Sequence, residues 1–129
     1  MSETGEIKLR STVVAVGDSV EEFRAARVLV FFNVGAPEEL AEFSVLHEAA
    51  VNRANVASGD SLRLGAETFD ILAVGEVANQ NLANLGHLVV KADGRRDPEM
   101  LGDVCVEARD LPRLVVGDPI EILGRPQEG

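Results

Sequence analysis

The two histidines of this sequence are the side chains best suited to chemistry near neutral pH. His47 and His87 carry imidazoles, and a neutral imidazole acts as a nucleophile or moves a proton in this pH range. In the run that ends at His47, strand alternation places Phe43, Val45 and His47 on one face. This pattern alone favours a histidine with satisfied hydrogen bonds in the core or at its rim, so a catalytic role needs further support.

His87 lies at a junction between two expected elements. It follows Gly86, a typical cap of a helix C-terminus, and opens the apolar run from Leu88 to Val90. Side chains at such a junction often reach the mouth of a barrel. The alternative is a histidine that stabilises the preceding helix end by its charge or by a hydrogen bond to a carbonyl.

The sequence lacks the residue patterns that other common catalytic and binding sites require. Two histidines and one cysteine give no zinc spacing, and the acidic residues form no calcium-binding loop. The glycine-rich loops that bind nucleotide phosphates and the serine elbow of hydrolases are absent from the sequence. Acidic pairs such as Glu38–Glu39 are typical of a solvated face, and Cys105 is expected to be a buried structural thiol. We therefore expect no metal and no cofactor.

Short apolar and β-branched runs, closed by glycine or polar turns, predict strands rather than long helices. The expected strands are Ile7–Val16, Val28–Asn33, Phe43–Glu48, Ser61–Leu64, Glu67–Val74, His87–Ala92, Asp103–Ala108 and Pro119–Leu123. Short helical turns are expected at Ser19–Ala26, Pro37–Leu40 and Val77–Leu85. Together they predict an all-β fold, a small barrel of about six to eight short strands with about one to three helical turns; a sandwich is the alternative closure.

Length and charge limit the partners of the chain. Its 129 residues fit one domain, which we expect to span residues 1–129. Twelve basic against 22 acidic residues give a net charge of −10, and Trp and Tyr are missing, so nucleic acid and anionic membranes are poor partners. The sequence contains neither a membrane-spanning apolar stretch nor a signal peptide, so we expect a cytoplasmic protein without membrane insertion.

Two blocks of sequence around the histidines resemble one protein family. The first reads Gly-Ala-Pro-Glu-Glu-Leu-Ala-Glu-Phe over residues 35–43, followed by Leu46 and His47. The second reads Ala-Val-Gly-Glu-Val-Ala over residues 73–78, followed by Asn81–Leu82, Leu85–Gly86–His87 and Asp93–Gly94. Both blocks resemble the glucitol/sorbitol-specific enzyme IIA component of the phosphoenolpyruvate-dependent sugar phosphotransferase system. They follow one another in the family's order, and weaker similarity extends over residues 11–123.

The resemblance implies a cytoplasmic phosphoryl carrier with a β-barrel-like fold. It maps the phosphorylated histidine onto His47, which would accept the group from the phosphocarrier protein HPr and pass it to the IIB component that serves the membrane IIC component. His87 is then the candidate for an auxiliary group that contacts the phosphate from an opening shared with His47. The chain departs from the family pattern after His47, where it reads Glu48–Ala49–Ala50. The alternative function is a non-catalytic binding or regulatory module that kept the family's barrel.

Overall fold

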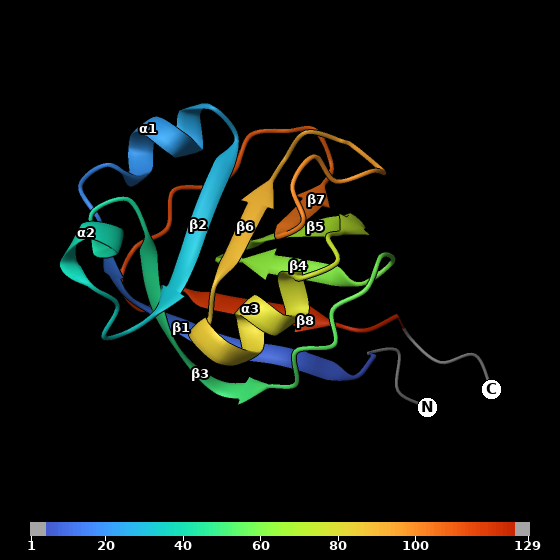
Figure 1. Ribbon diagram of the computed structural model, residues 1–129, viewed down its shortest axis with the longest axis horizontal. Helices are drawn as coiled ribbons and strands as arrows, with labels where there is room; N and C mark the ends of the chain where they lie inside the picture. Colours follow the sequence, from blue (N-terminus) through green and yellow to red (C-terminus); the bar gives the residue numbers. More distant parts are fainter. Residues whose placement is uncertain (1–4, 126–129) are drawn as a thin grey trace.

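The computed structural model describes residues 5–125, and its strands close into a barrel (Figure 1). The eight strands of this described part are β1 (Ile7–Val16), β2 (Val28–Asn33), β3 (Val45–Asn52), β4 (Ser61–Leu64), β5 (Glu67–Val74), β6 (Leu88–Lys91), β7 (Asp103–Val106) and β8 (Pro119–Leu123). Its helices are α1 (Val20–Ala25), α2 (Glu38–Ala41) and α3 (Ala78–Leu85). The predicted all-β barrel with short helical turns is confirmed.

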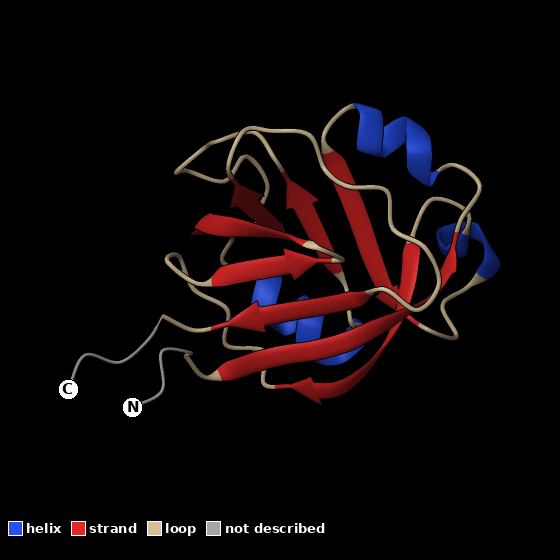
Figure 2. Cartoon of the chain, turned by 180° about the vertical axis from the view of Figure 1, so that it is seen from behind, coloured by secondary structure: helices blue, strands red, loops and turns tan. Residues whose placement is uncertain are grey.

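The strands follow one another around the barrel in the order β1, β3, β2, β6, β7, β5, β4 and β8, and β8 pairs with β1 again. The pairs β2–β3 and β6–β7 are parallel, whereas the other pairs are antiparallel. Closure gives every strand two neighbours and removes the open edge of a flat sheet. Figure 2 shows the strands forming the wall, with short helices beside it.

Alternating residues of the strands point inward and form one core. Its largest fully buried side chains are Phe31, Phe69, Leu9, Leu29, Leu62, Leu64, Ile71, Leu82, Leu88, Leu111, Ile120 and Ile122. Helix α3 adds Ala78 and Leu82 to this core. Five polar or charged residues of the described part are buried, and two of them, Ser11 of β1 and His47 of β3, lie on neighbouring strands. A buried polar side chain must find hydrogen-bond partners, and these two are therefore of interest.

Two strands begin later than the sequence predicts, and both differences concern the histidines. Strand β3 starts at Val45 rather than Phe43, because Ser44 closes a turn after α2 with its hydroxyl donating to the Leu40 carbonyl at 2.6 Å. Phe43 instead packs edge to face against Phe23, with ring centroids 5.8 Å apart. Strand β6 starts at Leu88, which leaves His87 in the turn that follows α3. Strand β3 also extends beyond the predicted Glu48, to Asn52.

Candidate functional site

His47 lies inside the barrel. It is the third residue of β3, between β1 and β2, and its exposed fraction is 1%. Phe31 of β2 meets its ring edge to face, with centroids 6.1 Å apart. The expected alternation of Val45 and His47 toward one face is confirmed, but that face is the interior. Of the two positions that the sequence pattern left open, the core and its rim, His47 occupies the core.

Both ring nitrogens of His47 are hydrogen-bonded. Nε2 lies 2.7 Å from the Gly86 carbonyl oxygen, and Nδ1 lies 2.6 Å from the Ser11 hydroxyl. A carbonyl oxygen only accepts, so Nε2 carries the hydrogen of the neutral ring. Nδ1 then holds the lone pair and accepts from the Ser11 hydroxyl. The two partners thus fix both the orientation of the ring and its tautomer.

The surroundings of His47 favour the uncharged imidazole. Burial lowers the pKa of His47 below its ordinary 6.5, and the hydrogen bond to the Gly86 carbonyl offsets part of that effect. The Ser11 hydroxyl accommodates either ring state because it both donates and accepts. The neutral ring is the form in which an imidazole has a lone pair for nucleophilic attack.

Gly86 reaches His47 because it ends α3 in a left-handed conformation. Its φ is +61°, and its N–H donates to the Leu82 carbonyl at 3.0 Å. A Cβ at this position would lie 2.0 Å from Oδ1 and 3.0 Å from the backbone nitrogen of Asn33, and together with the positive φ this favours glycine. The Nδ2 group of Asn52 donates to the same Leu82 carbonyl at 3.0 Å and ties α3 to the end of β3. These contacts hold the Gly86 carbonyl oxygen at hydrogen-bond distance from Nε2 of His47.

His87 occupies the other face of β2. Its ring stacks on Phe32 with centroids 4.1 Å apart, and its Nδ1 lies 3.2 Å from the Phe31 carbonyl oxygen. Phe31 and Phe32 are successive residues of one strand, so their side chains point to opposite faces. Because Phe31 contacts His47 in the core and Phe32 contacts His87, the two imidazoles do not open onto one depression. That expectation is wrong, and Gly86 rather than His87 contacts the nucleophile candidate.

Sequence reasoning missed Ser11 as a site residue. It lies on β1 two residues before Val13, which pairs with His47 in the antiparallel ladder. Residues two apart in a strand share a face, so Ser11 and His47 are diagonal neighbours inside the barrel. The available signal was one polar residue at an inward position between Leu9 and Val13.

Comparison with known proteins identifies the family of the chain. The profile of one family, the PTS system glucitol/sorbitol-specific IIA component, where PTS stands for phosphotransferase system, matches residues 8–121. The chain belongs to this family. The matched range contains His47, Ser11, Gly86 and His87, and the resemblance inferred from the two sequence blocks is confirmed. Membership makes the chain a phosphotransferase component.

Two relatives carry the name PTS system glucitol/sorbitol-specific EIIA component, one from Shigella flexneri and one from Escherichia coli K12. Each is 31% identical to this IIA chain over 97 residues, which are 75% of this chain and 79% of the relative. A crystal structure of a PTS system IIA component from Enterococcus faecalis V583 has the same fold. Its TM-score is 0.77 at 24% identity, over 88% of this chain and 98% of the crystallised one.

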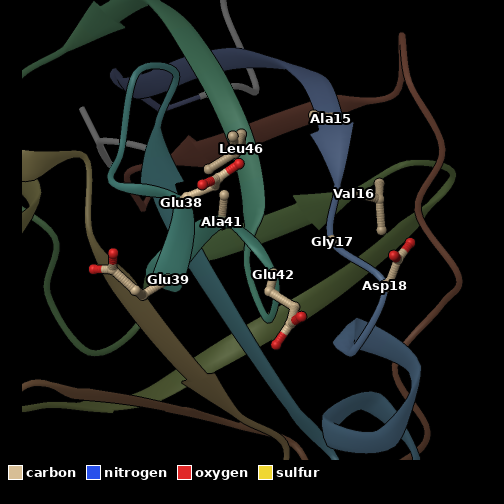
Figure 3. A pocket seen from close by; sticks show the side chains of 9 residues that line it. All are labelled: Ala15, Val16, Gly17, Asp18, Glu38, Glu39, Ala41, Glu42 and Leu46. Carbon is tan, nitrogen blue, oxygen red and sulfur yellow. The ribbon is translucent and has the colours of Figure 1, made fainter.

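An open acidic cavity lies beside the barrel of this IIA chain, with a volume of about 690 Å³. The carboxylates that line it belong to Asp18, Glu38, Glu39 and Glu42. Figure 3 shows these side chains pointing in different directions rather than converging on one point. Within residues 5–125 no three His, Cys, Asp or Glu side chains are grouped to hold a metal ion. The cavity is thus an acidic surface beside the strand of His47, whose neighbour Leu46 forms part of its lining.

Cys105 of β7 is fully buried, as predicted for a structural thiol. Burial, with a smaller contribution from Asp93, raises the pKa of its thiol to about 11. The thiol is therefore protonated near neutral pH, the less reactive form.

Among the helices in the described part of the chain, none is long and apolar enough to span a membrane.

Proposed function

We propose that this IIA chain carries phosphoryl groups on His47. It would accept the group from phosphorylated HPr in the cytoplasm and pass it to the IIB component, which serves the membrane IIC component. The observation that carries the proposal is the fixed, neutral imidazole of His47, held by Ser11 and Gly86 within the matched family range. Phosphoryl transfer between proteins needs a positioned nucleophile, because the group arrives already activated on its donor.

A buried imidazole must be uncovered before it can react. Ser11 lies within β1 and is paired on both sides, with Ala49 of β3 and Ile120 of β8. Gly86, by contrast, is itself buried but lies in a turn whose neighbour Leu85 is 51% exposed. A turn at the surface opens at lower cost than a paired barrel strand. We therefore assign the opening step to the Gly86 turn, which uncovers Nε2.

Release of the Gly86 carbonyl permits the ring to exchange its tautomer. Nε2 gives its proton to water and Nδ1 takes one up, so the ring stays neutral and the Ser11 hydroxyl changes from donor to acceptor. The Nε2 lone pair then attacks phosphorus in line. A new N–P bond forms as the N–P bond of the donor phosphohistidine breaks, and that electron pair returns to the donor nitrogen. Transfer to the IIB component would reverse these events with a different acceptor.

The experiment is phosphorylation in vitro with phosphoenolpyruvate, enzyme I and HPr. We expect a mass increase of one phosphoryl group that is acid-labile and base-stable, located on His47 by fragmentation. The control variant His47→Gln should remain unmodified. Modification of another residue, or none at all in the folded protein, would contradict the proposal.

A second candidate function is a non-catalytic barrel that retains the family fold. The observation that favours it is the burial of His47, together with the apolar Ala49–Ala50 that follow Glu48. In this case HPr would leave the chain unmodified, and the hydrogen bonds of His47 would serve only to satisfy polar groups in the core. The same phosphorylation experiment separates the two candidates.

A further inference from the structure

An apolar groove lies next to the turn that covers His47. Its volume is about 360 Å³, and its lining includes Phe32, Val34, Pro37, Leu40, Asn84 and Leu85. These residues come from β2 and the loop after it, from the first turn of α2 and from the C-terminal end of α3 (Figure 1). Val34 and Leu85 are 50% and 51% exposed. We call this surface the β2–α3 groove.

The β2–α3 groove is connected to His47 through the backbone on two sides. Leu85 directly precedes Gly86, whose carbonyl accepts the hydrogen bond from Nε2. On the other side, the Val34 N–H donates to the carbonyl of His47 at 3.0 Å. A molecule seated in the groove would contact both the strand end that holds the nucleophile and the turn that covers it.

Charge around the groove favours one kind of partner. Glu38 and Glu39 of α2 are exposed beside it, and within residues 5–125 neither carboxylate forms an ion pair. Figure 3 shows Glu38 and Glu39 on α2. Leu40, the next residue of α2, lines the groove, so the two carboxylates lie at its border. Unpaired carboxylates attract lysine and arginine, and they repel phosphate backbones, anionic lipids and a second copy of this acidic chain.

From these observations we infer that the β2–α3 groove is the docking site of the phosphorylated donor protein. The donor inserts an apolar side chain between Val34 and Leu85 while its basic residues face Glu38 and Glu39. Such an apolar anchor with a charged rim is the usual anatomy of a protein interface. The inference rests on the proposed function, since it names the surface through which the donor reaches His47.

The test compares a protein donor with a small donor. The double variant Val34→Ser/Leu85→Ser is phosphorylated either by phospho-HPr or by phosphoramidate, which needs no docking surface. Its matched control is Val115→Ser/Val116→Ser, because these valines are 55% and 66% exposed and lie outside the groove. We expect the ratio of the phospho-HPr rate to the phosphoramidate rate to fall about tenfold in the groove variant. The control variant should keep the wild-type ratio.

An unchanged ratio in the groove variant, or an equal fall in the control, would overturn the docking site. If the wild-type chain accepts phosphate from neither donor, the proposed function fails instead, and binding is then measured directly. Titration of ¹⁵N-labelled chain with unphosphorylated HPr should shift the amide signals of residues 32–40 and 84–86. Shifts confined to other surfaces, or dimerisation through the groove, would contradict the inference.

Glu38→Gln/Glu39→Gln should flatten the dependence of the phospho-HPr rate on salt.

Discussion

The hydroxyl of Ser11 lies 2.6 Å from Nδ1 of His47, inside the barrel and 36 positions away along the chain. The Gly86 carbonyl binds the other ring nitrogen but can only accept a hydrogen bond. Ser11 is thus the partner that can serve both tautomers, and in the proposed transfer Gly86 is the partner that would have to leave before Nε2 could react. In this proposal the paired strand β1 holds Nδ1 through Ser11 throughout, whereas the turn at Gly86 covers Nε2 and moves away from it.

The first prediction concerns Ser11. Replacing it by alanine leaves a buried ring nitrogen without a partner, which should lower the free energy of unfolding by about 1–3 kcal/mol. Phosphorylation of His47 should also slow, because the tautomer is no longer held. Ser11→Thr restores the hydroxyl and should recover the rate. The ¹⁵N shifts of the His47 ring report the tautomer; an unchanged ring signal and rate in Ser11→Ala would contradict a positioning role.

The second prediction compares two replacements of His47. Both His47→Gln and His47→Ala should abolish phosphorylation. Glutamine can still donate to the Gly86 carbonyl and accept from Ser11, whereas alanine leaves both groups unsatisfied and opens a cavity. His47→Ala should therefore be less stable than His47→Gln by about 2–4 kcal/mol in urea unfolding. Equal stability of the two variants would mean that these hydrogen bonds contribute little to the fold.

The third prediction is a dependence of stability on pH. Burial lowers the pKa of His47 in the folded chain below the ordinary 6.5. Between these two values the unfolded chain binds a proton that the folded chain does not, so the free energy of unfolding falls as pH falls. The slope should reach at most about 1.4 kcal/mol per pH unit. Urea unfolding between pH 7.5 and 5.5 measures it, and His47→Gln should lose this part of the dependence.

Most strand positions were predictable because alternation and glycine turns are local properties of the sequence. The predicted bounds of β1, β2, β4, β5 and β8 agree with the structure. The direction in which His47 points was not predictable, since a one-face pattern does not say whether that face is the interior. The contact of Gly86 with His47 was equally hidden, because it depends on the parallel pairing of β2 with β3 and on the packing of α3 against them.

The fourth prediction concerns His87. A group that donates to the transferring oxygens typically contributes about 10²–10³ in rate. The His87 ring instead stacks on Phe32, on the face of β2 away from His47. His87→Gln should therefore slow phosphorylation of His47 less than about tenfold, at saturating phospho-HPr. A loss of a hundredfold or more would restore the auxiliary role and would require a rearranged site in the complex.

The fifth prediction separates the Gly86 contact from backbone strain. Gly86 and Gly65 have nearly equal φ values of +61° and +62°, so alanine meets a similar left-handed backbone at each position. At Gly65 the added Cβ has ordinary contacts at 3.6 Å or more, whereas at Gly86 it lies 2.0 Å from Oδ1 of Asn33. Gly65→Ala should therefore cost about 1–2 kcal/mol of stability. Gly86→Ala should cost more, because its Cβ also lies 3.0 Å from the Asn33 backbone nitrogen, so the turn must shift from β2 even if the Asn33 side chain rotates away. That movement withdraws the carbonyl from Nε2, so the ¹⁵N signals of the His47 ring should change in Gly86→Ala alone. Equal stability losses and an unchanged ring in both variants would show that the Gly86 carbonyl does not hold the imidazole.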